Sequence, residues 1–277
     1  MTFAAKSGGK QAPGRFFVGR WEARVTPVAD TIGTTKLDAT VKLVPGTYDL
    51  LFQGKGTGLH RSRFTVKAGQ RTTKTLKVSR NLASKHAGAK VVGSSAGSLN
   101  AASLIDDTEA TNWAGVNEAD SVDAKGKSPF VVVDLAGGRQ TVSRVNVSAM
   151  LRPAAEDDND SLSGSRFTAL RKFAIEVCTS GCAGKDAKWK RIYTSPANAF
   201  PAVRPRPVAP NLQLRSFDVP DTVATHVRFV ALENQCTGFG GYAGEQDNDP
   251  LNDTDCKAAS DRDLSVRAAE LQVFGRR

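Results

Sequence analysis

The sequence predicts an all-β protein made of two β-sandwiches in series. Short runs with apolar residues at every second position recur along the chain, and Gly, Pro and Asn clusters separate them. The spacing of apolar residues that is typical of helices is almost absent. A length of 277 residues suits two domains. These observations favour a small N-terminal sandwich followed by a larger jelly-roll sandwich.

The first domain is expected over 15–80, after a disordered leader over 1–14 that contains few apolar residues. Pro45-Gly46 predicts a turn, and the last two strands of this domain are expected to form a hairpin about Ala68-Gly69-Gln70. The predicted strands lie at 16–18, 21–25, 39–43, 47–52, 63–67 and 73–78.

The second domain is expected over 101–277. The stretch over 81–100, rich in Ser, Ala, Gly and Lys, is expected to be a linker that becomes the entry to this domain. The apolar run 130–135 predicts a central strand, because a half-exposed strand would alternate. Five prolines between 196 and 210 predict an extended surface loop. The other predicted strands lie at 142–147, 172–177, 189–193, 214–219, 224–232 and 269–274.

Charge is divided unevenly along the chain. Residues 1–100 carry 17 Lys and Arg against 4 Asp and Glu, whereas the remainder carries 21 against 24. A basic module can meet nucleic acid or another anionic polymer, but a solvated basic surface is the commoner reading. No Arg-rich helix, zinc-finger spacing or RNA-binding signature accompanies the charge, so we expect no nucleic-acid partner.

No run of eighteen apolar residues is present, so no transmembrane helix is expected. The N-terminus lacks the apolar region of a signal peptide, which fits either a cytosolic protein or a fragment of a longer chain. The cysteines favour the second. Their even number predicts two disulfides. Three connectivities are possible, and we expect the local one, Cys178–Cys182 and Cys236–Cys256. Disulfides persist in oxidising compartments, so they predict an extracellular, secreted protein. A four-cysteine zinc site and free thiols are the alternatives.

The turn over 103–113 and the strand over 269–274 form a candidate cation site. The turn offers Asp106, two Thr hydroxyls and several carbonyls, and Glu270 begins the strand. A hard cation needs six to eight oxygen ligands. The alternative is an Asx-turn at Asp106, a buried Trp113 and a solvated Glu270.

The pattern Ile-Asp-x-x-x-x-Thr-x-Trp, the strand 130–135 and the closing Ala-Glu-Leu-x-Val-Phe resemble the discoidin family, the coagulation factor V/VIII type C domains. The resemblance covers roughly 85–275 and implies a galactose-binding-like jelly roll with a structural Ca²⁺, or Na⁺ in its place. The family usually has Gly where this chain has Asp107. The ligands that the resemblance implies are the carbonyls of Ser103, Thr108 and Ala269, the carboxylates of Asp106 and Glu270, and the carbonyl and hydroxyl of Thr111.

The loop over 235–256 is rich in Gly, Asp and Asn. Its Phe239, Tyr242 and Glu245 are candidate sugar-binding residues, with a structural plug over the end of the sandwich as the alternative. The acidic stretch 245–255 is either a second Ca²⁺ site or, more commonly, a solvated acidic loop. This loop and the junction at 80–84 are similar to the C-terminal region of secreted bacterial fungalysin-type metalloproteases. The resemblance implies that a catalytic domain lies upstream in cis.

Catalysis by this chain is not expected. The His-Glu-x-x-His pair of a zinc hydrolase is missing, and none of the three histidines stands in a nucleophile-elbow context. We therefore expect a monomeric, non-catalytic accessory region that binds a glycan or another cell-surface polymer for a secreted hydrolase. The alternative is a structural scaffolding appendage without a ligand of its own.

Overall fold

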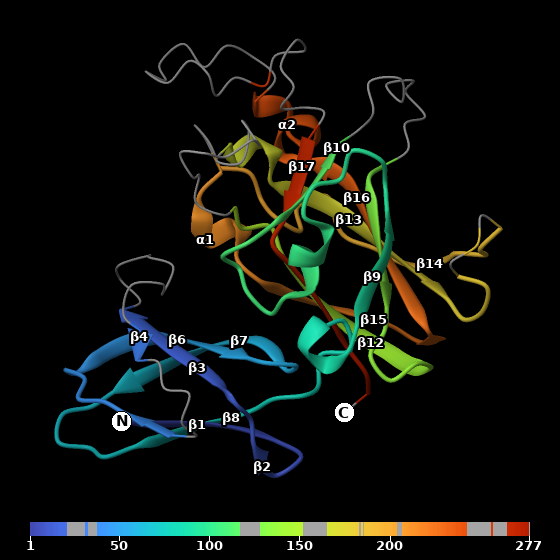
Figure 1. Ribbon diagram of the computed structural model, residues 1–277. Helices are drawn as coiled ribbons and strands as arrows, with labels where there is room; N and C mark the ends of the chain where they lie inside the picture. Colours follow the sequence, from blue (N-terminus) through green and yellow to red (C-terminus); the bar gives the residue numbers. More distant parts are fainter. Residues whose placement is uncertain are drawn as a thin grey trace.

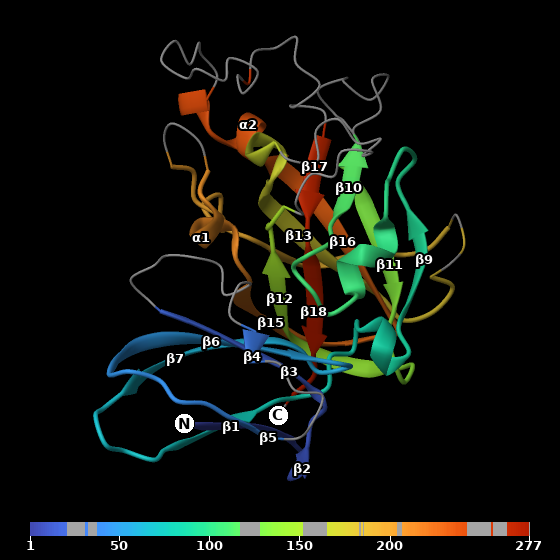
Figure 2. The same cartoon turned by 60° about the vertical axis from the view of Figure 1, so that its left-hand side comes forward.

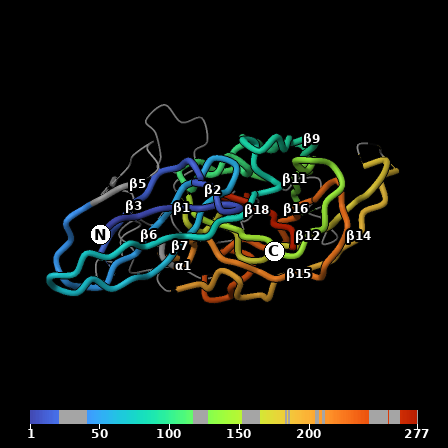
Figure 3. The backbone as a smooth tube through the Cα atoms, turned by 90° about the horizontal axis from the view of Figure 1, so that it is seen from below, coloured from blue at the N-terminus to red at the C-terminus, as the bar shows by residue number. Residues whose placement is uncertain are grey.

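The computed structural model describes residues 1–20, 31–32, 38–116, 128–151, 165–182, 184, 186–203, 207–242, 256 and 265–276. Two β-rich modules lie end to end, with the N-terminal module against one end of the larger sandwich (Figures 1 and 2). Seen from below, the N-terminal module lies on the left, and the C-terminus lies next to β12 and β15 of the larger module (Figure 3). Among the described residues no helix is long and apolar enough to cross a membrane.

Two four-stranded sheets form the N-terminal module. The first has the order β2-β1-β5, with β8 paired in parallel to β1, and the second has the order β4-β3-β6-β7. Phe3 and Phe16 come from opposite sheets and meet in one core with Phe52 and Phe64. The strands are β1 Thr2–Ser7, β2 Lys10–Gln11, β3 Gly14–Arg20, β4 Thr31–Ile32, β5 Asp38–Thr40, β6 Gly46–Gly54, β7 Gly58–Val66 and β8 Thr73–Lys77.

The predicted disordered leader over 1–14 is wrong. β1 is an interior strand, and Phe3 and Ala5 are buried in the core of the module. Its partner β8 is distant in sequence, so no local sequence pattern predicts the pairing. The predicted hairpin about Ala68-Gly69-Gln70 is also wrong, because β7 pairs with β6 whereas β8 joins β1 in the other sheet. The predicted strand at 21–25 lies outside the described residues.

The larger module is a β-sandwich, as predicted. A five-stranded sheet of order β14-β13-β16-β11-β9 faces the strands β15-β12-β18, and β10 pairs with β17 at one end. Its strands are β9 Lys90–Ser94, β10 Trp113–Val116, β11 Phe130–Asp134, β12 Gln140–Ser148, β13 Leu170–Cys178, β14 Lys190–Thr194, β15 Arg215–Ala224, β16 His226–Asn234, β17 Ser265–Ala268 and β18 Glu270–Phe274. The four-residue helices α1 Ala209–Leu212 and α2 Gln235–Gly238 lie in its connections.

The core of the larger module lies between these sheets. Trp113, Phe173 and Phe229 are fully buried there, with Trp113 edge-on to Phe229. β11 is an interior strand, paired with β16 on one side and β9 on the other, as its apolar run predicted. Val131 and Val133 face this core, and Val132 lies on the opposite face.

Residues 81–100 are part of the larger module and not a linker, which corrects the predicted boundary. β9 is an edge strand of the five-stranded sheet. Before it, the side chain of Asn81 both donates and accepts hydrogen bonds within the sandwich. Its oxygen accepts a hydrogen bond of 2.9 Å from the backbone N–H of Val273. Leu82 and Ala83 lie in the same core.

Both predicted disulfides are present, Cys178–Cys182 and Cys236–Cys256. The first closes a short turn at the start of the connection between β13 and β14, and the second ties α2 to Cys256. No free cysteine occurs among the described residues.

Candidate functional site

The turn and the strand that the sequence predicted to form a cation site come together. The 3-10 helix Ala101–Ile105 leads into Asp106, whose carboxylate accepts a hydrogen bond of 2.8 Å from the Thr111 hydroxyl. Glu270 begins β18 and pairs in register with Ser148 of β12. Asp106 and Asp107 both act on the Glu270 carboxylate electrostatically, so acidic side chains from the two ends of the domain lie close together.

Glu270 is the unusual group at this site. It is 0% exposed, and neither of its carboxylate oxygens has a hydrogen-bond partner among the described residues. Burial raises the pKa of Glu270 well above its ordinary value, and the negative charges of Asp107 and Asp106 raise it further. The backbone N–H of Thr108 acts in the opposite direction and lowers the pKa of Glu270, but it does not outweigh these effects. The reading in which Glu270 is solvated is wrong.

The residues present fit a bound cation. A buried carboxylate without a partner is costly, and a bound cation would offset that cost. One carboxylate oxygen of Asp106, Oδ1, is likewise buried without a partner. No group of three or more His, Cys, Asp or Glu that could hold a metal is found in the described part of the chain. The expected ligand set would therefore have to draw most of its oxygens from the backbone.

The remaining predicted ligands lie on the same turn and strand. Ser103 is in the 3-10 helix before Asp106, and Thr108 lies two residues after it. Ala269 is fully buried between β17 and β18, and its N–H is bonded to the Ser148 carbonyl at 2.8 Å. Their carbonyl oxygens would complete the set that the family resemblance implies.

Asp107 occupies the position where the resembling family usually has Gly, and it adopts the left-handed φ of 63° that such a position requires. Its buried carboxylate accepts hydrogen bonds from Asn81 Nδ2 at 3.1 Å and Ser84 Oγ at 2.5 Å, and lies 3.1 Å from His86 Nδ1. It also accepts the backbone N–H of Gly56 at 2.9 Å, from the N-terminal module. Asp107, the residue at which this chain departs from the family pattern, thus links the two modules.

Other contacts extend this anchor. The Gln53 side chain donates to the Asp107 carbonyl at 3.0 Å, and Arg61 forms an ion pair with Glu109 at 2.5 Å. Glu109 also accepts from Ser148 Oγ and from the Leu214 N–H. The β6–β7 hairpin is therefore held on the turn that forms the candidate cation site. Sequence reasoning missed this arrangement, for which the unusual Asp107 was the one signal.

The predicted sugar-binding aromatics on the loop over 235–256 need correction. Tyr242 is fully buried, packs edge-on against Phe167 and Phe239, and bonds through its hydroxyl to Val203. Its ring is therefore part of a structural plug and not an exposed stacking face. Phe239 is half-buried beside it under Arg171. Glu245 and the acidic stretch 245–255 lie outside the described residues.

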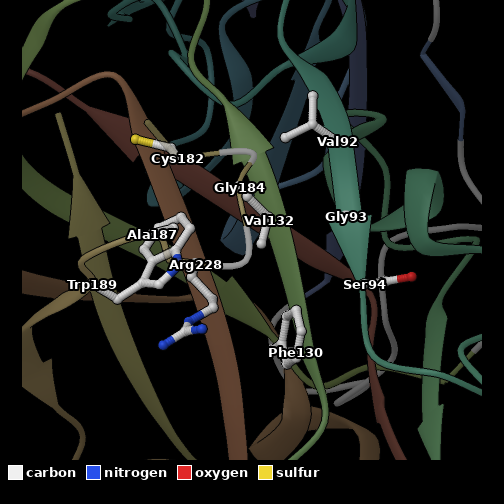
Figure 4. Close-up of a pocket in the computed structure, with 10 residues that line it drawn as sticks. All are labelled: Val92, Gly93, Ser94, Phe130, Val132, Cys182, Gly184, Ala187, Trp189 and Arg228. Atoms are coloured by element: carbon white, nitrogen blue, oxygen red, sulfur yellow. The ribbon is translucent and has the colours of Figure 1, made fainter. Parts of the chain in front are cut away.

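A pocket of about 530 Å³ lies on the outer face of the five-stranded sheet (Figure 4). Val132 and Val92, the latter 44% exposed, lie on its apolar side. The connection between β13 and β14, whose first turn the Cys178–Cys182 disulfide closes, contributes Cys182, Gly184, Ala187 and Trp189. The remaining lining residues are Gly93, Ser94, Phe130 and Arg228.

Arg228 lies between two aromatic rings in this pocket, with Trp189 on one side and Phe130 on the other (Figure 4). Its guanidinium carbon lies 4.7 Å from the Trp189 ring centroid and 5.4 Å from that of Phe130. Glu176 forms an ion pair with Arg228 through its Oε2 oxygen, and its Oε1 oxygen lies 3.0 Å from Arg191. The guanidinium is thus fixed in place before any ligand arrives.

Sequence reasoning did not find this pocket. The alternation of β16 was its only signal, because Val227 and Phe229 face the core and Arg228 between them must face outward. Pairing of Val132 with Arg228 across β11 and β16, together with the fold of the β13–β14 connection, brings the other residues to it.

No protein-family model matches the sequence, and no curated protein matches it. Solved structures with a similar backbone include CBM32-3 of a family 31 glycoside hydrolase from Clostridium perfringens, with TM-score 0.43, 15% identity and coverage of 68% of this chain and 91% of that one. The larger module is a β-sandwich, and nearly all regular structure in the described residues is β-strand, which confirms the predicted all-β fold class.

Two further structures have a similar backbone. CpGH89CBM32-5 from Clostridium perfringens, in complex with GalNAc-β-1,3-galactose, has TM-score 0.37 and 17% identity, with coverage of 70% of this chain and 99% of that one. Chitosan-binding module 1 of a chitosanase/glucanase from Paenibacillus sp. IK-5 has TM-score 0.38 and 16% identity, with coverage of 71% and 99%. At these TM-scores and identities, none of the three structures assigns a function or a family to this chain.

Proposed function

We propose that this chain is a non-catalytic, extracellular accessory region whose galactose-binding-like jelly roll binds carbohydrate. The observation that carries the proposal is the outer-face pocket, in which Trp189 and Phe130 flank Arg228 beside the apolar Val92 and Val132. Aromatic and aliphatic groups suit the apolar face of a pyranose ring, and a few fixed polar groups orient its hydroxyls. The printed names of the structural neighbours, which are carbohydrate-binding modules, agree with this class of ligand.

We place the cation in a structural role. Asp106, Thr111 and Glu270, with the carbonyls of Ser103, Thr108 and Ala269, would hold Ca²⁺, or Na⁺ in its place. When bound, the ion supplies positive charge to a buried carboxylate that has no partner. Because only the folded chain offers this oxygen set, binding stabilises the fold by mass action. The pocket and the ion site lie on different elements, so the ion would act on stability and not on the ligand.

The extracellular setting rests on the two disulfides, which persist in oxidising compartments. The parent protein that we propose is a secreted hydrolase, a fungalysin-type metalloprotease by the resemblance of 80–84 and 232–247. Its catalytic domain would lie upstream in cis and would be held near a glycan or cell-surface polymer by this monomeric accessory region.

The test is binding of the whole chain to insoluble and soluble polysaccharides, with Trp189→Ala as the pocket variant. We expect wild type to be retained by at least one polysaccharide and Trp189→Ala to lose most of that retention at unchanged melting temperature. Phe239→Ala is the matched control, because it removes an aromatic ring from the loop over 235–256. Loss of binding in the control alone would move the site to that loop. A blank polysaccharide panel for the folded wild type would favour the scaffolding alternative.

A further inference from the structure

Arg228 gives the outer-face pocket a positive charge that its surroundings do not neutralise. Glu176 is the acidic partner of both Arg228 and Arg191, so two guanidinium groups share one carboxylate. Lys188 and Lys190 are exposed on the same connection and strand. The acidic groups nearby are Asp186, which is exposed, and Asp134, which lies 3.8 Å from His226. The cations therefore outnumber the acids around the pocket.

The guanidinium of Arg228 has one nitrogen to spare. Its Nε and Nη2 both point to Glu176, and Nη1 has no hydrogen-bond or ion-pair partner among the described residues. The Arg228 side chain is 26% exposed and lines the pocket, so a ligand in the pocket can reach it. The rings of Trp189 and Phe130 fix the orientation of the guanidinium and partly shield it from water, which strengthens a charge-assisted hydrogen bond.

From this arrangement we infer that the pocket selects an acidic sugar, a hexuronate residue of a polysaccharide, whose carboxylate binds Arg228 while its ring lies against Val92, Val132 and the aromatic side chains. The inference rests on the proposed function, because it names the ligand class of the same pocket. A neutral sugar would use the apolar surface but could offer Arg228 Nη1 only an uncharged hydroxyl acceptor. An uronate uses the same surface and also offers a carboxylate, whose charge-assisted hydrogen bond to the guanidinium is stronger.

The experiment compares trigalacturonate with its methyl ester by calorimetric titration of the full chain, because the two probes share one sugar backbone and esterification removes the charge of the carboxylates. We expect wild type to bind trigalacturonate about tenfold or more tightly than the ester, the gain typical of a hydrogen bond between charged groups. Arg228→Gln should bind both probes equally and with the affinity that wild type has for the ester. Trp189→Ala should weaken both.

Arg191→Gln is the matched control. Arg191 is bound to the same Glu176, but it is 48% exposed and does not line the pocket. This variant removes the same charge from the chain, whose net charge is +10, so it corrects for non-specific attraction of an anion. We expect it to keep most of the preference for trigalacturonate. Equal loss in both variants would overturn the inference, since the preference would then be diffuse electrostatics.

Three outcomes separate the inference from the proposed function. If wild type binds the ester as tightly as the acid, the charge selection is wrong while carbohydrate binding stands. If a sulfated galactan oligosaccharide binds more tightly than trigalacturonate, the carboxylate assignment is wrong. If wild type binds none of these probes and no polysaccharide of a wider panel, the proposed function fails together with the inference. Arg228→Lys keeps the positive charge and should retain part of the preference for trigalacturonate over its ester. This variant therefore distinguishes loss of the charge from a folding defect caused by replacing Arg228.

Discussion

The backbone N–H of Gly56 donates a hydrogen bond of 2.9 Å to the carboxylate of Asp107, across the boundary between the two modules. Asp107 lies directly after Asp106, so one turn faces both the candidate cation site and the neighbouring module. Around this bond, Gly58 adopts a φ of +75° and a Cβ on it would lie 2.5 Å from the Gln272 side chain. The modules are thus docked through specific contacts and not joined by a tether.

Asp107→Gly should separate the anchoring role of Asp107 from its backbone role. Glycine keeps the left-handed backbone but leaves the buried donors of Asn81, Ser84 and Gly56 without an acceptor. We expect a loss of roughly 2–4 kcal/mol in free energy of unfolding, from unsatisfied buried donors. Chemical denaturation measures this loss. Hydrogen exchange should show faster exchange at Gly56 in particular.

Asp107→Asn is the control for that change, because it keeps one acceptor oxygen and a side chain that tolerates the left-handed region. It should retain more stability than Asp107→Gly. Equal stability of wild type and Asp107→Gly would show that the four contacts of the carboxylate contribute nothing net to module docking.

The ion pair between Arg61 and Glu109 provides a second test of docking. Glu109 is held in place by Ser148 and Leu214, so Arg61 meets a fixed carboxylate in a site that is mostly buried. A double-mutant cycle with Arg61→Gln and Glu109→Gln should give a coupling free energy of about 1–3 kcal/mol, which exceeds that of an exposed pair. Coupling near zero would mean that the hairpin is held by its other contacts alone.

The pH dependence of stability should reveal Glu270. In a chelator, the unfolded chain releases the Glu270 proton near the ordinary pKa of 4.5, while the folded chain keeps it to higher pH. The folded state then binds more protons in that window, so its free energy of unfolding falls as pH rises through it. Asp106, whose pKa burial also raises, acts in the same direction.

Calcium should oppose this loss. Because the ion binds the ionised carboxylate, the rise in melting temperature on adding Ca²⁺ should grow with pH. Glu270→Gln should be more stable than wild type in chelator at about pH 8, since it removes the buried charge, and should not respond to Ca²⁺. Identical melting curves for wild type with chelator and with Ca²⁺ at that pH would rule out the cation site.

The sequence pattern was sufficient for β11 to β16 and β18 of the larger module, because alternation such as that of β12 directly marks a strand with one buried face, but it missed β9, β10 and β17. It was also sufficient for the two disulfides, whereas the proximity of Asp106 and Glu270 was predicted mainly from the family resemblance. It failed at β1, where Phe3 and Ala5 are buried only because β8, some seventy residues away, pairs beside them. The outer-face pocket is lined by three strands and a loop, so its residues become neighbours only once the register of the sheet is known.

The two disulfides should differ in what their removal changes. Cys178→Ala/Cys182→Ala opens the short turn over 178–182, at the start of the connection that later carries Trp189. Chain entropy assigns that turn about 2 kcal/mol of stability. We expect sugar binding to weaken more than stability alone would predict, because Cys182 lines the pocket and the connection that leads to Trp189 is no longer tied to the end of β13. Affinity for the best polysaccharide, measured well below the melting temperature, tests this.

Cys236→Ala/Cys256→Ala is the matched comparison. Its bridge spans 20 residues, so chain entropy assigns it about 3 kcal/mol, the larger loss of stability. Cys236 and Cys256 pack with Phe167 and Tyr242 in the plug, away from Arg228. Sugar affinity of the folded variant should therefore stay close to that of wild type. If instead this variant loses affinity while Cys178→Ala/Cys182→Ala keeps it, the ligand binds at the loop over 235–256 and the outer-face pocket is not the site.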